Sequence, residues 1–189
     1  RTLDVSRYDL VVTDYEPVTA WAGKLAKREV IGIGHQYAFG PNTPVAGNSF
    51  LQHTVMRLFA PVKRPVGLHW AAFDRNVLPP ILDLPPLDDT VADDFFLVYL
   101  PFENQSEITR WLQGFPEYRF KQYSSALTDH NSGNVSCFKA NIAGFKRDLA
   151  HCKGVICNSG FELISECLQW RKSVLTRPLS GQMEQLSNA

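Results

Sequence analysis

The sequence lacks three features that mark large classes of protein: an excess of one charge, a long apolar run and the cysteine spacing of metal sites. Lysine plus arginine equals aspartate plus glutamate, at 19 each among 189 residues. No overall positive field therefore attracts phosphate backbones, and we do not expect nucleic acid as a main partner. The longest apolar stretch, residues 95–102, is interrupted by Pro101 and is far shorter than the roughly 20 residues that cross a bilayer. The sequence predicts no membrane-spanning helix.

The cysteines and aspartates of the sequence do not form the motifs typical of metal sites. The four cysteines, at positions 137, 152, 157 and 167, do not form the C-x-x-C spacing of zinc or redox sites. Cys157 and Cys167 lie among apolar residues, so we expect them to be small buried thiols, for which a reducing cytosol is the natural compartment. The sequence also has no Asp-x-Asp metal motif. We therefore expect neither a bound metal ion nor a cofactor.

Short apolar runs alternate with helix-like segments in the first half of the chain. Strands are expected over residues 8–13, 29–34 and 65–70, and helices over 18–27 and 48–60. The first run is rich in β-branched and apolar residues and stops at a polar segment with Pro17, which is typical of a strand buried on both faces. Strand, helix and strand in this order predict a parallel βαβ unit.

A proline-rich segment separates this half from the next. Four prolines lie within residues 78–89, where they deny backbone donors to a sheet and favour an extended chain. We place the linker there, with domains over residues 1–88 and 89–189. Beyond it, strands are expected over 95–100, 118–123, 135–139, 154–157 and 173–176, and helices over 106–113, 145–151 and 161–170. This repeated alternation predicts an α/β fold with a Rossmann-like, doubly wound sheet.

The strongest candidate for a ligand site is the turn that follows the expected strand 154–157. In doubly wound sheets, ligands bind beyond the carboxyl ends of the strands. There the sequence Asn158-Ser159-Gly160 leads directly into a helix. Gly160 lets a ligand approach the backbone closely, and the helix start offers unpaired N–H groups with a partial positive charge. We therefore expect this turn to bind an anion.

Two glutamates in the following helix have different interpretations. Ser159 and Glu162 have the S-x-x-E spacing of a capping box, and we favour that structural role for Glu162. Glu166 lies one turn further along on the same face, opposite an apolar stripe that includes Ile164 and Leu168. It is too far from the helix start for capping. A carboxylate there could accept hydrogen bonds from the vicinal hydroxyls of a ribose, and on spacing alone a solvated helix face is an equal alternative.

Polar residues return after the last expected strand. That strand stops at Arg177-Pro178, and a segment rich in glutamine and glutamate, residues 181–189, follows at the same edge of the sheet. Such side chains offer the mixed donors and acceptors that sugar hydroxyls require. Two patterns stand out here: G-F-E-L-I-S-E over residues 160–166, and P-L-S-G-Q-x-E-Q-x-x-N-A over residues 178–189.

These two patterns resemble the C-terminal donor half of GT-B glycosyltransferases. The similarity is to family 28, which includes the lipid-linked muramyl-peptide N-acetylglucosaminyltransferase, and to related uncharacterised bacterial and archaeal glycosyltransferases. It is specific over residues 154–189 and looser elsewhere, where residues 8–39 are similar to the latter part of the acceptor domain. The resemblance implies two Rossmann-like domains, the N-terminal one incomplete in this chain. It also implies inverting, metal-independent transfer of a sugar from a nucleotide diphosphate sugar, a UDP-sugar, to an acceptor.

The resemblance also implies roles for individual residues of the donor half. The residues that it assigns to donor binding are Ser159, Gly160, Glu166, Gln182, Glu184, Gln185 and Phe145. Ser159 and Gly160 fall on the turn that faces the diphosphate, and Glu166 falls on the ribose-binding glutamate. Gln182, Glu184 and Gln185 belong to the segment that touches the donor sugar. Phe145 falls near the base pocket, and the alternative interpretation is that it is an aromatic residue of the core. Residues 101–104 depart from the glycine-rich diphosphate loop of the muramyl enzyme.

Candidates for catalysis come from the other half of the chain. A transferase needs a base that takes the proton from the acceptor hydroxyl. Asp14, Glu16 and His35 all follow expected strands and so lie at the functional edge of the sheet. Imidazole is chemically suited because it titrates near neutral pH, although a histidine at a strand end more commonly has a structural hydrogen-bonding role. The sequence alone singles out none of the three, and the part of the acceptor domain that we expect outside this sequence is an alternative place for the base.

Other functions stay open on the same residues. Epimerisation or hydrolysis of a nucleotide sugar is one alternative, and a non-catalytic nucleotide-sugar-binding or scaffold protein is another, because fold does not determine function. For a transferase, a lipid-linked or glycan acceptor fits the resemblance, and we expect a cytoplasmic protein that is peripheral to the inner face of the membrane if the acceptor is a lipid. The sequence begins at Arg1 without a leader or the family's N-terminal glycine-rich loop and its histidine, so we expect the first strands to lie outside it.

Overall fold

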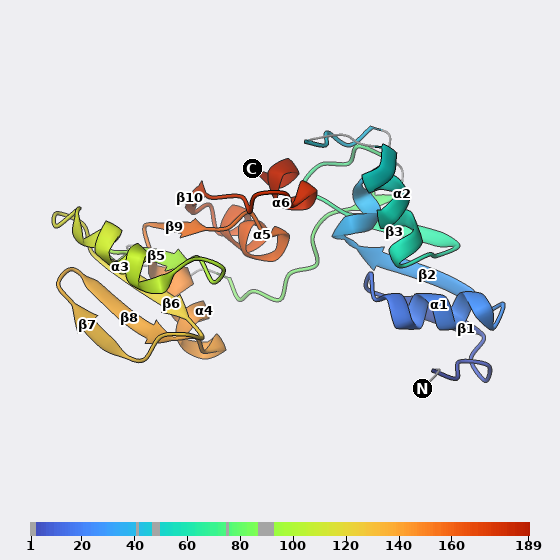
Figure 1. Ribbon diagram of the computed structural model, residues 1–189, viewed down its shortest axis with the longest axis horizontal. Helices are drawn as coiled ribbons and strands as arrows, with labels where there is room; N and C mark the ends of the chain where they lie inside the picture. Colours follow the sequence, from blue (N-terminus) through green and yellow to red (C-terminus); the bar gives the residue numbers. More distant parts are fainter. Residues whose placement is uncertain (1–2, 41, 47–49, 75, 87–92) are drawn as a thin grey trace. The chain divides into compact units, whose positions relative to one another are not determined.

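The computed structural model describes residues 3–40, 42–46, 50–74, 76–86 and 93–189. The chain divides into two compact units, Arg1–Ile81 and Leu82–Ala189, and the boundary lies within the proline-rich segment 78–89 (Figure 1). Each unit has its own sheet, in which parallel pairing dominates. The α/β class predicted from the alternation of strands and helices is therefore confirmed for both units.

Unit 1 contains a four-stranded sheet in the order β1-β2-β3-β4, with each neighbouring pair parallel. Its elements are β1 (Leu10–Thr13), α1 (Pro17–Leu25), β2 (Glu29–Gly34), the 3-10 helix η1 (His35–Ala38), α2 (Phe50–Phe59), β3 (Arg64–Leu68) and β4 (Val77–Leu78). The predicted parallel βαβ unit is formed by β1, α1 and β2. The carboxyl ends of β1, β2 and β3 consequently lie at one edge of the sheet.

Helix α1 begins where its sequence supplies a cap. The Glu16 carboxylate accepts hydrogen bonds from the backbone N–H groups of Val18, at 2.8 Å, and Thr19, at 2.7 Å, which satisfies two donors of the first turn. Gly23 then lets the helix approach the sheet closely, because a Cβ atom at Gly23 would lie 2.5 Å from Cγ2 of Val30 in β2. The Glu16 cap therefore determines where α1 begins, and Gly23 allows α1 to pack closely against β2.

Unit 2 contains a six-stranded sheet in the order β10-β9-β5-β6-β8-β7, in which only the pair β7 and β8 is antiparallel. Its elements are β5 (Phe96–Tyr99), α3 (Gln105–Gln113), β6 (Phe120–Ser124), β7 (His130–Ser132), β8 (Val135–Lys139), α4 (Ile142–His151), β9 (Gly154–Cys157), α5 (Phe161–Gln169), β10 (Ser173–Thr176) and α6 (Met183–Asn188). From β5 the chain builds β6 and β8 on one side, then crosses to β9 and β10 on the other. The strand order therefore reverses between β5 and β9, which makes this pair the topological switch point.

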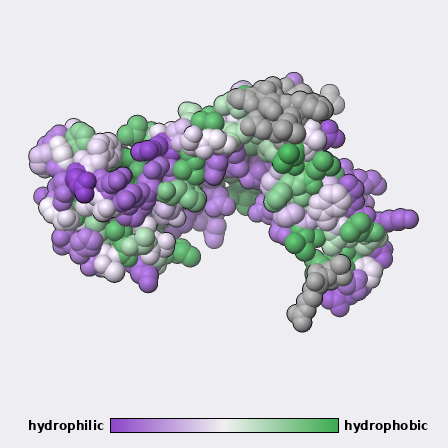
Figure 2. All heavy atoms as spheres, viewed as in Figure 1, coloured by the Kyte–Doolittle hydropathy of each residue, from purple (hydrophilic) through white to green (hydrophobic). Residues whose placement is uncertain are grey.

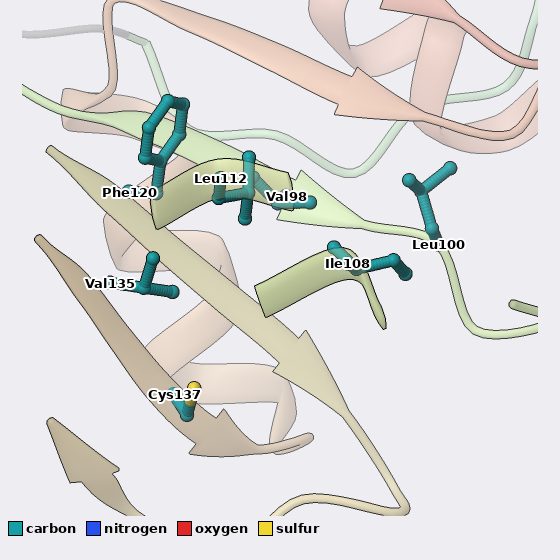
Figure 3. Packing of buried hydrophobic residues seen from close by; sticks show 7 residues of the cluster. All are labelled: Val98, Leu100, Ile108, Leu112, Phe120, Val135 and Cys137. Atoms are coloured by element: carbon teal, nitrogen blue, oxygen red, sulfur yellow. The ribbon is translucent and has the colours of Figure 1, made fainter. Parts of the chain in front are cut away.

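Buried apolar side chains hold helix α3 against the sheet of unit 2. The helix supplies Ile108 and Leu112, and strands β5, β6 and β8, with the residue that follows β5, supply the rest of the cluster: Val98, Leu100, Phe120, Val135 and Cys137. Figure 3 shows these side chains gathered between the helix and the strands. Leu112, Val98, Val135 and Cys137 are fully buried. Burial of the larger apolar side chains contributes roughly 1.5–3 kcal/mol each, so this cluster anchors α3 to β5, β6 and β8, and β5 is one of the two strands at the switch point.

The structure differs from the sequence predictions at element starts, in polar segments and in the burial of β1. Leu10 and Val12 of β1 are exposed while Val11 and Thr13 are buried, so the expectation that this strand is buried on both faces is wrong. Helix α4 begins at Ile142, earlier than predicted, because Asn141 Oδ1 accepts a hydrogen bond from the Gly144 N–H at 2.7 Å. Strand β6 begins at Phe120, because the preceding residues form a turn whose carbonyl groups bond to the side chain of Asn134. The short elements η1, β4, β7 and α6 were not predicted. On α5, Leu168 is exposed, so the apolar stripe predicted to run through it is wrong there.

The surface mixes polar and apolar residues. Hydrophilic and hydrophobic residues alternate over the face drawn in Figure 2. Within the ranges that the structure describes, no helix combines the length and the apolar character needed to cross a bilayer.

Candidate functional site

The site lies at the switch point of the unit 2 sheet. Strands β5 and β9 are parallel neighbours, with Phe96 opposite Gly154 and Tyr99 opposite Cys157. The chain continues from them in opposite directions along the sheet, from β5 to β6 and from β9 to β10. Beyond the carboxyl ends of β5 and β9, between the N-terminal parts of α4 and α5, is a pocket of about 370 Å³. Its walls are Tyr99, Ala140, Asn141, Ile142, Phe145, Lys146, Glu162, Leu163 and Glu166. This volume falls within the range of small-molecule sites.

Aromatic rings form one wall of the pocket. The Phe145 ring lies 5.2 Å from that of Tyr99 and 5.4 Å from that of Tyr123, both in edge-to-face geometry. Phe145 is half-buried and lines the pocket. Phe145 therefore packs against two tyrosine rings, as a core aromatic would, and also lines the pocket.

A buried carboxylate fixes the helix that carries this ring. Asp148, one turn after Phe145 on α4, accepts hydrogen bonds from Tyr123 Oη at 2.7 Å and Lys121 Nζ at 3.0 Å, and pairs with Arg147 Nε at 3.2 Å. Burial alone would raise the pKa of Asp148, but these three partners outweigh burial and hold it below its usual value. Burial and the bond to Asp148 raise the pKa of Tyr123. The tyrosine therefore stays a donor and α4 stays anchored to β6.

Glu166 faces the pocket and is paired. Its carboxylate forms an ion pair with the ammonium group of Lys146, which comes from α4. Only 15% of the Glu166 side chain is exposed, against 38% for Lys146. Glu162 lines the same pocket one turn earlier, as the spacing of the two glutamates predicts. Glu166 therefore does not lie on a solvated helix face, which was one of the two interpretations drawn from the sequence.

The start of α5 has no side-chain cap. Its N-cap residue is Gly160, and among the described residues no side chain caps the helix with a hydrogen bond, so the capping box predicted from Ser159 and Glu162 is wrong. Ser159 is fully buried, and its Oγ has no hydrogen-bond partner among the described residues. Gly160 has an ordinary φ of −71°, and a Cβ atom there would meet nothing within 4 Å. Open space therefore lies in front of the Gly160 backbone and not in front of the Ser159 hydroxyl.

The C-terminal segment supports this turn. Asn158 Nδ2 donates to the Arg177 carbonyl at 2.9 Å, and Asn188 Nδ2 donates to the Ser159 carbonyl at 3.1 Å. Gln185 is buried, and its Oε1 accepts from the Leu179 N–H at 3.1 Å. The structure therefore gives the amide oxygen of Gln185 a structural bond.

The other two polar residues assigned to the donor sugar lie on the same segment. Gln182 is exposed at the start of α6, and Glu184 is half-buried. Neither they nor Gln185 belong to the walls of the pocket that contains Glu166. The structure thus brings Phe145 and Glu166 together in one pocket, and places the other three residues outside its walls, on the segment whose Asn188 bonds to the turn that starts α5.

The loop after β5 also contacts this region. Asn104 Oδ1 accepts from the N–H groups of Ser106 and Glu107 and so caps α3. Glu103 forms an ion pair with Arg177 Nε at 3.1 Å. This loop therefore joins the segment after β10, a connection that sequence spacing could not reveal.

All four cysteines are free and buried, as predicted for Cys157 and Cys167. Burial raises the pKa of both of these thiols to about 12. Each is therefore a neutral, packed side chain at physiological pH and not an activated nucleophile.

The three candidates for the catalytic base, Asp14, Glu16 and His35, differ in burial and in their hydrogen bonds. Glu16 caps α1, and its hydrogen bonds to Thr19 and Val18 lower its pKa. Asp14 is exposed at the end of β1, beside the end of β2: a Cβ atom at Gly34 would lie 2.8 Å from Asp14 Oδ1. His35 is 4% exposed, and its Nδ1 lies 2.9 Å from the Leu68 carbonyl oxygen.

A second histidine, which the sequence patterns did not single out, lies beside His35. The His69 ring is 5.3 Å from the His35 ring and 5.0 Å from that of Phe73. Burial, and secondarily the nearby His35, lower the pKa of His69. The carboxyl ends of β2 and β3 therefore carry a cluster of histidine and aromatic rings. The signal was present as His69 directly after a strand, but the strand was predicted to continue to residue 70.

Comparison with known proteins identifies the family. The family model described as "Glycosyl transferase family 1" matches residues 2–189. Among solved structures, the chain is similar to the glycosyltransferase SnogD from Streptomyces nogalater, with a TM-score of 0.56, 14% identity, and coverage of 96% of this chain and 57% of that one. It is also similar to the spinosyn forosaminyltransferase SpnP, with a TM-score of 0.52, 11% identity, and coverage of 93% and 58%.

A third similar structure is Arabidopsis thaliana UGT89C1 complexed with UDP-L-rhamnose, with a TM-score of 0.52, 13% identity, and coverage of 95% of this chain and 53% of that one. This chain thus spans a little over half the length of each of the three structures. Comparison with curated proteins gives no match. The structural similarities show the GT-B type of fold that the motifs implied, and the match over nearly every residue shows that the chain belongs to glycosyl transferase family 1.

Proposed function

We propose that this chain carries the donor-binding domain and part of the acceptor side of a glycosyltransferase that uses a nucleotide diphosphate sugar, with a UDP-sugar as donor. The observation that carries the proposal is the pocket between α4 and α5, at the switch point of the unit 2 sheet. It combines an aromatic wall, a shielded carboxylate and an adjacent helix start that has no side-chain cap. A nucleoside diphosphate needs these features in the same order, for base, ribose and phosphates.

Each part of the donor has a partner in this arrangement. The base packs against Phe145 and Tyr99, and the ribose hydroxyls donate to the Glu166 carboxylate. The diphosphate lies in the open space before Gly160, where the backbone N–H groups and the dipole of α5 favour negative charge. The donor sugar extends toward Gln182 and Glu184. Gln185 contributes its amide N–H₂ group, because its oxygen is already bonded to Leu179.

The chemistry that fits this site is a direct displacement with inversion. An acceptor oxygen attacks the anomeric carbon, the bond from that carbon to the diphosphate oxygen breaks, and the acceptor proton passes to a base. The helix start stabilises the departing diphosphate, so the step needs neither a metal ion nor a cofactor. Asp14 and His35 at the edge of the unit 1 sheet are the candidates for the base. Glu16 is less suited because its carboxylate already caps α1.

For the acceptor we propose a lipid-linked molecule or a glycan in the cytoplasm. A lipid acceptor would bring the protein to the inner face of the membrane as a peripheral protein.

A thermal-shift screen of nucleotide diphosphates and their sugars tests the proposed function. A ligand that binds only the native state stabilises it by about 2.7 kcal/mol when present at one hundred times its Kd. We expect UDP and a UDP-sugar at millimolar concentration to raise the melting temperature. The absence of a shift with every nucleotide would favour a scaffold, and release or epimerisation of the sugar without an acceptor would favour hydrolysis or epimerisation.

A further inference from the structure

Lys146 is placed to contact the same ligand as Glu166. The two residues come from different helices and face each other at the pocket wall, where their side chains form an ion pair. An ammonium group has three N–H donors and a carboxylate has about four acceptor positions. One ion pair therefore leaves both groups with hydrogen-bonding capacity toward the pocket. The pair presents a strong donor and a strong acceptor side by side.

A vicinal diol is the ligand group that matches such a pair. Each hydroxyl can donate its hydrogen to the carboxylate and accept through its oxygen from the ammonium group. A sugar that lacks one of the two hydroxyls would leave one of the charged groups without its ligand bond in a shielded place, which sites built to bond a hydroxyl reject strongly. The shielding is greater on the Glu166 side, where only 15% of the side chain is exposed.

Charge argues against a phosphate in this part of the pocket. The wall carries Glu162, Glu166 and Lys146, two negative charges against one positive charge. A phosphate here would meet repulsion, whereas an uncharged sugar would not. Lys146 also neutralises Glu166, so that a diphosphate at the start of α5 approaches a less negative surface.

We propose that Lys146 is a specificity-determining residue that, together with Glu166, selects ribonucleotides over 2′-deoxyribonucleotides. This inference rests on the proposed function. It assigns the selection to the pair and not to the carboxylate alone. An arginine at this position would keep the charge and the donors, and a methionine would keep the length and the apolar stem but remove both.

The test is a calorimetric titration of the full chain with UDP and with 2′-deoxy-UDP. We expect the wild type to prefer UDP roughly tenfold or more, Lys146→Met to lower that ratio to about threefold or less, and Lys146→Arg to keep most of it. Lys153→Met is the matched control, because Lys153 also forms an ion pair, with Asp94, but on an exposed surface outside the pocket walls. It should leave the ratio unchanged.

Two results would overturn the inference alone: a wild type that binds UDP and 2′-deoxy-UDP equally well, or a folded Lys146→Met variant that keeps the wild-type ratio. A wild type that binds neither nucleotide would overturn the proposed function as well. The ratio distinguishes a ligand contact from a structural role, because lost stability would weaken binding of both nucleotides alike.

Discussion

The side chain of Asn188 donates a hydrogen bond to the backbone carbonyl of Ser159, over 3.1 Å between Nδ2 and O. This bond ties helix α6 to the turn that starts α5. From the other side, Asn158 Nδ2 bonds to the Arg177 carbonyl at 2.9 Å. The turn proposed to face the diphosphate is therefore held by the segment that the motifs assign to the donor sugar.

Removal of this bond should loosen the end of unit 2. In Asn188→Ala, the Ser159 carbonyl loses a partner, and we expect the free energy of unfolding to fall by about 0.5–1.5 kcal/mol. Urea denaturation measures the change. Asn131→Ala, at an exposed position of β7, is the control and should be nearly neutral. An equal loss in both variants would mean that α6 does not support the turn.

Gly160 should tolerate alanine in the fold but not at the site. Its φ is ordinary, and a Cβ atom added there would have no neighbour within 4 Å. We therefore expect Gly160→Ala to change the free energy of unfolding by less than about 1 kcal/mol, because the reduced entropy of the unfolded chain is opposed by the weaker preference of alanine for the N-cap position. The new methyl group would occupy the space proposed for the diphosphate, so calorimetry should show a larger loss of affinity for UDP than for uridine.

Gly154→Ala provides the contrast. A Cβ atom there would lie 2.9 Å from the Ser173 carbonyl oxygen, so this variant should be less stable than the wild type. Unchanged UDP affinity in a folded Gly160→Ala variant would place the diphosphate elsewhere.

The buried thiols should be inert in the native protein. Burial raises the pKa of Cys157 and Cys167 from 9.0 to about 12, so at about pH 8 we expect DTNB to label them only as fast as the protein unfolds. Above pH 9 the folded state holds these protons more tightly than the unfolded state, so the stability that they contribute declines as the pH rises from about 9 toward 12. Cys157→Ala should show a shallower decline in pH-dependent denaturation. Rapid labelling of the native protein would contradict the burial of both thiols.

Much of the fold could be predicted because short apolar runs are local signals of parallel strands. The bounds of β2, β9 and β10 agree with the apolar runs in the sequence, since each run stops at a polar or small residue. Strand β7 could not be predicted in this way, because His130-Asn131-Ser132 is polar and is a strand only through its pairing with β8. A polar edge strand has no apolar pattern to reveal it.

The candidate site could be predicted only in part, for a related reason. Glu166 was found because its spacing from the helix start is a property of one helix. Lys146 was missed because its contact with Glu166 depends on how α4 packs beside α5, which no local pattern specifies. The capping box failed because Ser159 and Gly160 are both acceptable N-cap residues, and only the three-dimensional structure shows that Gly160 holds that position.

The most direct measurement is the affinity of UDP for the wild type and for Glu166→Ala by isothermal titration calorimetry. Loss of hydrogen bonds from ribose to a charged group should weaken binding by about 1.5–3 kcal/mol, or roughly tenfold to more than a hundredfold. Glu107→Ala, at an exposed position of α3 outside the pocket walls, is the control and should bind UDP like the wild type. A folded Glu166→Ala variant with the UDP affinity of the wild type would contradict the assignment of the pocket between α4 and α5 as the nucleotide site.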